Sequence, residues 1–575
     1  MRFPMLTPPP TVRRTQDVFL GLNRNPCPGE GEFSYMENLS SDGYPLLTTR
    51  PRRGLYAAPE AASGLIAKDS LCYTDGGDFV INGYHVDMKL SDAPKSMVSM
   101  GAYVIILPDK KYVNTADLSD FGSLEAEITA PAPVFTPAAL DGEDRIPAGS
   151  GPVLPESPEP GQLWVDTSGS APVLMAWSEN AGMWVEEASS YVRIQAPGIG
   201  KPFREYDGVT LSGPGVAGTD LEGAAVIWGR GDDYILVPGL LPEATEGMGA
   251  VTVSRTVPDM DFVIESENRL WGCRYGLNRQ GKFVNELYAS KLGDFRNWNC
   301  FMGLSTDSYT VSLGSDGVFT GAVSFLGYPL FFKENCVHRV YGSYPAAYRL
   351  QTTPCRGVRK GSEKSLARVG EVLYYHAAGG ICAYDGSLPV GVSAALGQEE
   401  YREAVAGALG EKYYVSMLDS QGAPGLYVYD TCRGLWHRED GTRAKEFCTC
   451  RRELYFLDAS DGTIKTVLGS GTREPEIRWC AQTGPIGATG PDNLYLSRLT
   501  AQLSLDAGGS AGIEVEYDGS GVWEPLGKAA CGALRRITLP VRPRRCGFLR
   551  LRLSGVGGVK LYALTKTLES GSDVT

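Results

Sequence analysis

VLYYHAAGGICAYDGS, residues 372–387, contains two short runs rich in aromatic and aliphatic side chains. Gly379 and Gly380 separate the two runs, and Asp385 and Gly386 follow the second run. Glycine tolerates the backbone angles of tight turns, and two apolar runs joined by such a turn are typical of a β-hairpin. The stretch therefore predicts the order strand, turn, strand, turn.

The same unit recurs along the chain. Comparable hairpins begin at Leu270–Cys273, Leu330–Lys333, Leu373–His376, Tyr413–Ser416 and Leu454–Leu457. The last three intervals are about 40 residues long, which is the repeat length of a propeller blade. Two similar units, 71–83 and 103–112, precede these five. The pattern predicts an all-β fold with a β-propeller of six or seven blades.

Composition sets other parts of the chain apart. Residues 131–187 hold nine carboxylates and a single basic residue, Arg145, with nine prolines between 131 and 172. Residues 494–562 alternate apolar and polar positions, as strands with one buried face do. We predict an extended N-terminal arm at 1–60, first propeller blades at 61–130, an inserted Pro-rich acidic linker with small β modules at 131–245, the remaining blades at 246–470, and a C-terminal β-sandwich at 471–575.

Charge and cysteine usage narrow the function classes. The net charge of −13 argues against a molecule that grips nucleic acid phosphates over its whole surface, although a channel in which DNA slides would also avoid strong positive charge. No apolar run is long enough to span a bilayer, and residues 1–10 do not resemble a signal peptide, so we expect no membrane span and synthesis in the cytoplasm. Most of the thirteen cysteines lie in apolar runs, which predicts reduced core thiols. Cys448 and Cys450 have no second pair at zinc-like spacing, so we expect no metal and no cofactor.

Catalytic motifs give no signal. The four histidines lie in different segments, none beside a serine or cysteine nucleophile motif. Gly213–Gly218 fits G-x-G-x-x-G, but no βαβ unit surrounds it. Adjacent carboxylates such as Glu399 and Glu400 are candidates for a propeller glycosidase by proximity alone. We therefore predict no catalytic residues and no enzymatic activity.

Two groups of side chains are candidates for binding. Arginines cluster near both ends of the chain and could pair with acidic surfaces of other subunits, with a solvated surface as the alternative. These interface candidates are Arg50, Arg52, Arg53, Arg535, Arg536, Arg542, Arg544 and Arg545. Trp164, Trp177 and Trp184 in the acidic insert could present aromatic faces to a glycan, or could form an ordinary small core.

Several short runs resemble virion proteins of tailed bacteriophages and prophages. They include Met36–Leu39 with Tyr44-Pro45 and Arg50–Arg53, Glu267–Trp271 with Tyr288–Ser290, Ser365-Leu366, Tyr384–Gly386 with Leu388-Pro389, Tyr427–Thr431 with Gly434–His437, Pro543–Cys546 and Glu569–Asp573. The similarity is closest to the β-propeller tail nozzle and packaged-DNA stabilisation proteins of short-tailed phages. That resemblance implies a ring, commonly hexameric, below the portal and adaptor. The acidic insert has no counterpart in the resemblance.

The first hypothesis is therefore a structural virion protein. It would form a homo-oligomeric ring, or nozzle, of the tail around the DNA channel, contact the head-to-tail adaptor or other tail proteins, retain packaged double-stranded DNA and conduct it on ejection. The second hypothesis is a tail adhesin that binds a receptor or a bacterial surface glycan through the insert. A propeller glycoside hydrolase is the third.

Overall fold

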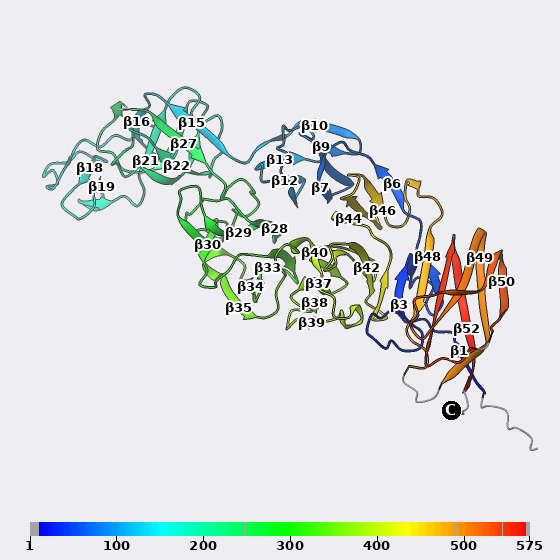
Figure 1. Cartoon of the computed structure of the whole chain (residues 1–575). Coiled ribbons are helices and arrows are strands. Elements are labelled where there is room, and N and C mark those ends of the chain that lie inside the picture. Colours follow the sequence, from blue (N-terminus) through cyan, green and yellow to red (C-terminus); the bar gives the residue numbers. More distant parts are fainter. Residues whose placement is uncertain (1–10, 247–248, 489–492, 543, 571–575) are drawn as a thin grey trace, which may run out of the picture. The chain divides into compact units, whose positions relative to one another are not determined.

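The computed structural model describes residues 11–246, 249–488, 493–542 and 544–570. Pro543 and residues 571–573 of the runs quoted above lie outside these residues. Strands dominate the described chain, and its helical segments are three single 3-10 turns: η1 (Pro345–Ala347), η2 (Glu363–Ser365) and η3 (Ala394–Leu396). None of the helices in the described ranges is long and apolar enough to cross a membrane. The fold is all-β (Figure 1).

Seven antiparallel sheets of the blade type occur in the described residues, each a meander of four consecutive strands or a variant of it. The first two contain β7 (Ala62–Ala67), β8 (Leu71–Asp75), β9 (Asp78–Ile81) and β10 (Tyr84–Asp87), then β11 (Ser96–Met100), β12 (Tyr103–Leu107), β13 (Lys111–Asn114) and β14 (Phe121–Ser123). The next two contain β28 (Phe262–Ser266), β29 (Arg269–Leu277), β30 (Phe283–Ala289) and β31 (Tyr309–Ser312), then β32 (Gly321–Phe325), β33 (Tyr328–Lys333), β34 (Cys336–Tyr341) and β35 (Arg349–Pro354). The last three contain β36 (Ala367–Val369), β37 (Val372–Ala377), β38 (Gly380–Tyr384) and β39 (Val390–Gly391), then β40 (Arg402–Leu409), β41 (Lys412–Leu418), β42 (Pro424–Asp430) and β43 (Leu435–Arg438), and finally β44 (Ala444–Cys450), β45 (Glu453–Asp458), β46 (Ile464–Thr466) and β47 (Thr472–Arg473) with β6 (Gly54–Ala57).

Each hairpin expected from sequence begins with the second strand of one of these sheets and continues through the turn that follows that strand. In the quoted stretch, Ala377 pairs with Gly380, so residues 378 and 379 form a two-residue turn between β37 and β38. Gly379 has φ +92°, a value that side chains with a Cβ rarely adopt. The repeated aromatic and aliphatic positions are buried in the blade cores, and the fold is a β-propeller with seven blade sheets in the described residues.

The chain forms two compact units. The first contains residues 1–94, 332–337 and 353–575, and the second contains residues 95–331 and 338–352. Within the first unit, the first strands of successive blades pack side by side: β36 on β40, β40 on β44, and β44 on β7. Within the second unit, β11 packs on β28 and β28 on β32.

An N-terminal strand completes the last blade. β6 pairs with both β46 and β47, although about 400 residues separate them in sequence. The pairing requires a close approach at Gly54, where a Cβ atom would clash with the carbonyl oxygen of Ser470. The first and last parts of the propeller are thus held in one sheet of the first unit.

The predicted arm and the predicted sandwich share one ten-stranded sheet system. Its strands are β1 (Thr11–Gln16), β2 (Gly21–Leu22), β3 (Glu32–Glu37), β4 (Leu39–Ser40), β5 (Leu47–Thr49), β48 (Arg478–Thr483), β49 (Leu494–Tyr517), β50 (Glu524–Pro540), β51 (Leu549–Val556) and β52 (Val559–Ser570). The long strand β49 pairs with β52 over its first part and with β51 over its second, and the change follows a register shift between Leu505 and Ser510. The short arm strands bury Phe33, Met36 and Leu39 in this β-sandwich core, because two- to six-residue strands cannot bury an apolar face alone.

The insert lies between β14 and β28 in the second unit and consists of three small sheets. One contains β15 (Ala126–Ala130), β22 (Gly208–Ser212), β23 (Gly223–Val226) and β27 (Val251–Arg255), and another contains β16 (Val134–Ala138), β21 (Tyr191–Gln195), β24 (Gly229–Arg230), β25 (Tyr234–Pro238) and β26 (Thr245–Glu246). The third contains β17 (Ser150–Gly151), β18 (Leu163–Asp166), β19 (Val173–Ser178) and β20 (Met183–Glu186). The third sheet carries the three tryptophans and lies between β16 and β21 in sequence.

Candidate functional site

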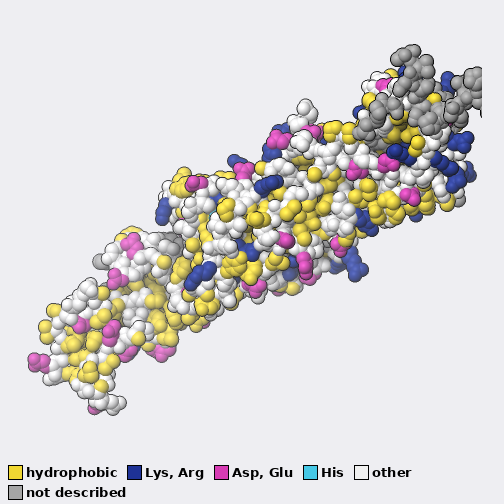
Figure 2. Space-filling model, turned by 90° about the horizontal axis from the view of Figure 1, so that it is seen from below, with side chains coloured by type: hydrophobic (Ala, Val, Ile, Leu, Met, Phe, Trp, Pro, Cys, Tyr) yellow, Lys and Arg dark blue, Asp and Glu magenta, His cyan; other side chains and the backbone are white. Residues whose placement is uncertain are grey.

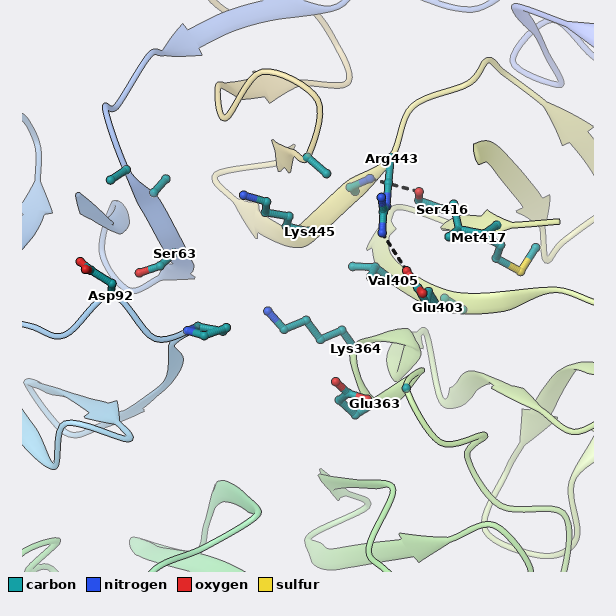
Figure 3. Close-up of a pocket in the computed structure, with 18 of the residues that line it drawn as sticks. Ser63, Asp92, Glu363, Lys364, Glu403, Val405, Ser416, Met417, Arg443 and Lys445 are labelled. Carbon is teal, nitrogen blue, oxygen red and sulfur yellow. Dashed lines mark hydrogen bonds and ion pairs between the residues drawn. The ribbon is translucent and has the colours of Figure 1, made fainter. Parts of the chain in front are cut away.

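A cavity of about 820 Å³ opens in the first unit among the first strands of its blades (Figure 3). β7, η2, β40 and β44 contribute to its wall together with the loop that contains Asp92. The charged side chains that line it are Asp92, Glu363, Lys364, Glu403, Arg443 and Lys445. Figure 3 shows Lys364 and Lys445 extending into the space from different segments, while Ser63 and Asp92 lie across from them.

β-Bulges in the first strands orient the side chains that line the cavity. The strand register shifts between Ala62 and Leu65 in β7, between Arg402 and Val405 in β40, and between Ala444 and Glu446 in β44. A bulge adds an unpaired residue and redirects the side chains next to it. Bulges in the first strands of three blades therefore place polar side chains at the cavity. Without the bulges, the regular alternation of side-chain direction would point apolar residues there.

The carboxylates of this cavity are coupled to cations. Glu403 forms an ion pair of 2.8 Å with Arg443, and both side chains are half-exposed. Glu446, beside the cavity lining, lies 3.4 Å from Lys364 and accepts a hydrogen bond from the backbone N–H of Leu65. Burial raises the pKa of Glu446, and the nearby Lys364 offsets only part of that effect. The two ion pairs, Glu403 with Arg443 and Glu446 with Lys364, therefore link residues of different blades.

No group of three or more His, Cys, Asp or Glu side chains in the described residues is placed to hold a metal ion. Cys72, Cys273, Cys336 and Cys382 are buried cysteines. Three histidines, His338, His376 and His437, are buried, and the fourth lies at the surface beside Asp78. Glu399 and Glu400 are engaged by Arg24 and Arg359 at 3.8 Å each.

The two arginines of the arm that face inward form a buried charge network. Arg53 lies 2.9 Å from Glu439 and 2.8 Å from Asp440, while Arg50 lies 2.5 Å from Glu474 and 3.3 Å from Asp440. The side chains of Arg50 and Arg53 are 4% and 6% exposed. Burial acts to raise the pKa of Asp440, but Arg53, Arg50 and hydrogen bonds from Thr442 together outweigh it and lower that pKa. The network joins the arm, the end of the sixth blade and the start of the sandwich.

The remaining interface candidates are exposed, namely Arg52, Arg535, Arg536, Arg542, Arg544 and Arg545. Arg535 and Arg536 lie on β50, which pairs with β49. Arg544 lies 3.0 Å from Glu524, and its guanidinium lies over the Tyr517 ring. Arg535 and Arg536, which form the basic edge of the sandwich, are exposed and in the described residues have no ion pair, whereas Arg50 and Arg53 are paired within the chain.

The three tryptophans share one face of the β17–β20 sheet. Trp177 pairs across the strands with Trp184, and Trp164 pairs with Met175, two residues before Trp177. The ring centres of Trp177 and Trp184 are 5.8 Å apart at an interplanar angle of 67°. All three side chains are partly exposed. The opposite face of the sheet forms a small core of Leu163, Val165 and Leu174.

Sequence patterns do not reveal this cavity, because the residues that line it come from several blades and share no motif. The only local signal is charge at the start of first strands, as in Arg402-Glu403 and Arg443–Glu446. Such charges are usual at exposed strand ends, so their convergence becomes visible only when the blades are packed.

No family model matches the chain, and no curated protein matches it. Solved structures give weak similarities. BamB from Moraxella catarrhalis has a TM-score of 0.23 and 12% identity over 55% of this chain and 84% of that one. The exo-beta-1,3-galactanase from Phanerochaete chrysosporium has a TM-score of 0.21 and 8% identity over 53% of this chain and 94% of that one. At these values the similarities support no inference about activity, substrate or partners.

Proposed function

We propose that the chain is a structural component of a tailed-phage virion, in which copies form a ring, or nozzle, of the tail around the DNA channel. The ring helps to retain packaged DNA and conducts it on ejection. It is a homo-oligomer, with a hexamer favoured, and it contacts the head-to-tail adaptor or other tail proteins. The chain is made in the host cytoplasm, and its work is architectural and not enzymatic.

The observation that carries this proposal is the way the first unit fixes both ends of the described chain. β6 completes the last blade, and β1–β5 are built into the same sheet system as β48–β52. Both ends of the described chain are therefore held by paired strands, in addition to the buried charge network of Arg50 and Arg53. Such a construction suits a protein that must resist the pressure of packaged DNA.

The surface chemistry supports the same role. The exposed arginines of the sandwich edge offer an acidic partner a matching surface, which favours a defined contact with a neighbouring subunit or an adaptor. The net charge of −13 keeps the rest of the molecule from binding DNA phosphates tightly. In the cavity, Glu403 and Arg443 neutralise each other, which favours a structural role for that carboxylate.

Imaging of the purified protein and of phage particles tests the proposal. We expect closed rings of one stoichiometry in electron micrographs, and density for the chain on the tail axis. A monomer at all concentrations, or a position away from the axis, would contradict it. Hydrolysis of any glycan in a panel of polysaccharides would contradict the non-enzymatic assignment.

The tryptophan face favours a second candidate function, adhesion through the insert. β16 and β21 remain paired if residues 139–190 are replaced by a short turn, because Ala138 pairs with Tyr191. In phage that carry this deletion, lost adsorption with intact particles would support adhesion. Lost assembly would instead support a structural role for the insert.

A further inference from the structure

The face of the β17–β20 sheet with Trp164, Trp177 and Trp184 combines aromatic rings with unpaired negative charge. We propose that this face binds an organic ammonium group, such as a quaternary ammonium or the amine of an amino sugar, displayed on a surface polymer. The inference rests on the adhesion function proposed above and names the chemistry of its ligand.

The first observation is the geometry of the rings. Trp177 and Trp184 lie on adjacent strands and pack edge to face, with their ring centres 5.8 Å apart and their planes inclined at 67°; this pair is the tryptophan corner. Met175 and Glu186 form a cross-strand pair on the same face, directly beside that corner. A cation placed against an indole face is attracted by the negative charge of the ring, and Trp is the strongest of the aromatic residues in this role.

The second observation is that the indole N–H groups of Trp164 and Trp184 donate hydrogen bonds within the chain. Trp164 donates to the backbone oxygen of Gly151 at 3.3 Å, and Trp184 donates to that of Pro155 at 3.4 Å. These hydrogen bonds fix both rings. At Trp164 and Trp184 these hydrogen bonds leave the π surface, and not the polar edge, for a ligand, which favours a cation over a group that needs hydrogen-bond donors.

The third observation is the charge around the sheet. Residues 131–187 hold nine carboxylates, and their one basic residue, Arg145, lies 3.0 Å from Glu187. Glu156, Glu159, Glu179 and Glu186 are exposed, and within the described ranges no cation is paired with any of them. In Figure 2 the surface around β18 and β19, at the left of the view, shows magenta and yellow side chains with hardly any dark blue. The negative potential attracts a cation and disfavours an anionic ligand.

Choline and its neutral isostere 3,3-dimethyl-1-butanol test the proposal, since the two differ in charge and hardly in shape. Binding to the full-length protein is followed by tryptophan fluorescence and by calorimetry. We expect choline to bind about tenfold more tightly than the isostere, because the isostere loses the interaction between the cation and the rings. Equal binding of the two probes, or no choline binding at tens of millimolar, would overturn the inference.

Two conservative variants test the location of the site, and a third serves as their control. Trp177→Phe keeps an aromatic ring in the sheet and is expected to weaken choline binding several-fold, because Phe is the poorer partner for a cation. Glu186→Gln removes one exposed charge beside the corner and is expected to weaken binding at low salt. Glu143→Gln, an exposed residue outside this sheet, is the matched control and should leave binding nearly unchanged.

Ring assembly and choline binding can be tested independently of each other. If wild-type protein forms closed rings but binds no choline, the nozzle assignment stands and only the inference about the ligand is lost. Binding of choline by a protein that never forms rings would overturn the nozzle assignment and leave this inference intact. An equal loss of binding in the Glu143→Gln control would contradict a site at the tryptophan corner.

Discussion

Arg50 and Arg53 at one end of the sequence and Arg535 and Arg536 at the other belong to equally basic runs, yet their surroundings differ completely. The first two are buried among Glu439, Asp440 and Glu474, and the second two are exposed on an outer strand of the sandwich. A buried arginine that loses its partners costs far more than an exposed one. The comparison therefore separates arginines that stabilise the fold from arginines that are free to bind.

The largest effect is expected for Arg53→Ala. The substitution leaves Glu439, whose side chain is 4% exposed, without its closest cation. Breaking a buried ion pair in this way destabilises a protein by about 3–5 kcal/mol. Chemical denaturation measures the loss, and Arg52→Ala, an exposed neighbour, is the control with an expected change below about 0.5 kcal/mol. Equal effects of the two substitutions would show that the network does not stabilise the fold.

The next effect concerns the strand that follows these arginines. In Gly54→Ala the new methyl group would clash with the Ser470 carbonyl oxygen and would lie 2.6 Å from the Thr466 hydroxyl oxygen. Overpacking against backbone costs about 1–3 kcal/mol, and we expect the upper end of that range because β6 must move away from β46 and β47. Gly314→Ala is a suitable control, since a methyl group added there would have no neighbouring atom within 4 Å. A melting temperature equal to that of the control would argue against tight closure of the last blade.

These two sites also show how far sequence reasoning reaches. The hairpin repeat predicts the blades because each one follows from local alternation and turn residues, as in β37 and β38. The fate of Arg53 depends on Glu439 and Asp440, which lie nearly 400 residues away, so no local pattern could reveal it. Likewise Trp177 and Trp184 could be placed on one sheet from sequence, but their angle and the hydrogen bond of the Trp184 indole required the structure.

A smaller, pH-dependent effect is expected from His437, which lies in β43, the last strand of the sixth blade. Burial, helped by Lys412, lowers its pKa from 6.5 to about 4. The unfolded chain takes up a proton as the pH falls through 6.5, while the folded chain does not until about 4. Stability is therefore lost as the pH falls between these values, by about 2 kcal/mol from pH 7 to pH 5 for this one group.

Denaturation of wild-type and His437→Gln protein at both pH values checks this expectation. The variant lacks the titrating group, so its stability should change less between pH 7 and pH 5. His376, whose pKa burial also lowers to about 4, contributes in the same direction and remains in both proteins. An identical pH dependence of the two proteins would show that His437 is not held neutral in the fold.

The smallest effect on stability, and the clearest effect on assembly, is expected for Arg536→Glu. Arg536 is exposed opposite Gln502 on β49, and no acidic partner in the described part of the chain forms an ion pair with it. Reversing its charge should change the free energy of unfolding by less than about 0.5 kcal/mol. If the basic edge contacts an acidic surface of another subunit or an adaptor, the same change should weaken that association, most strongly at low salt where charges are least screened. Sedimentation at two salt concentrations separates the outcomes. A stable variant that assembles as wild type does would show that this edge is not part of the interface. A stable variant that assembles poorly would show that Arg536 serves association, unlike the buried arginines, which stabilise the fold.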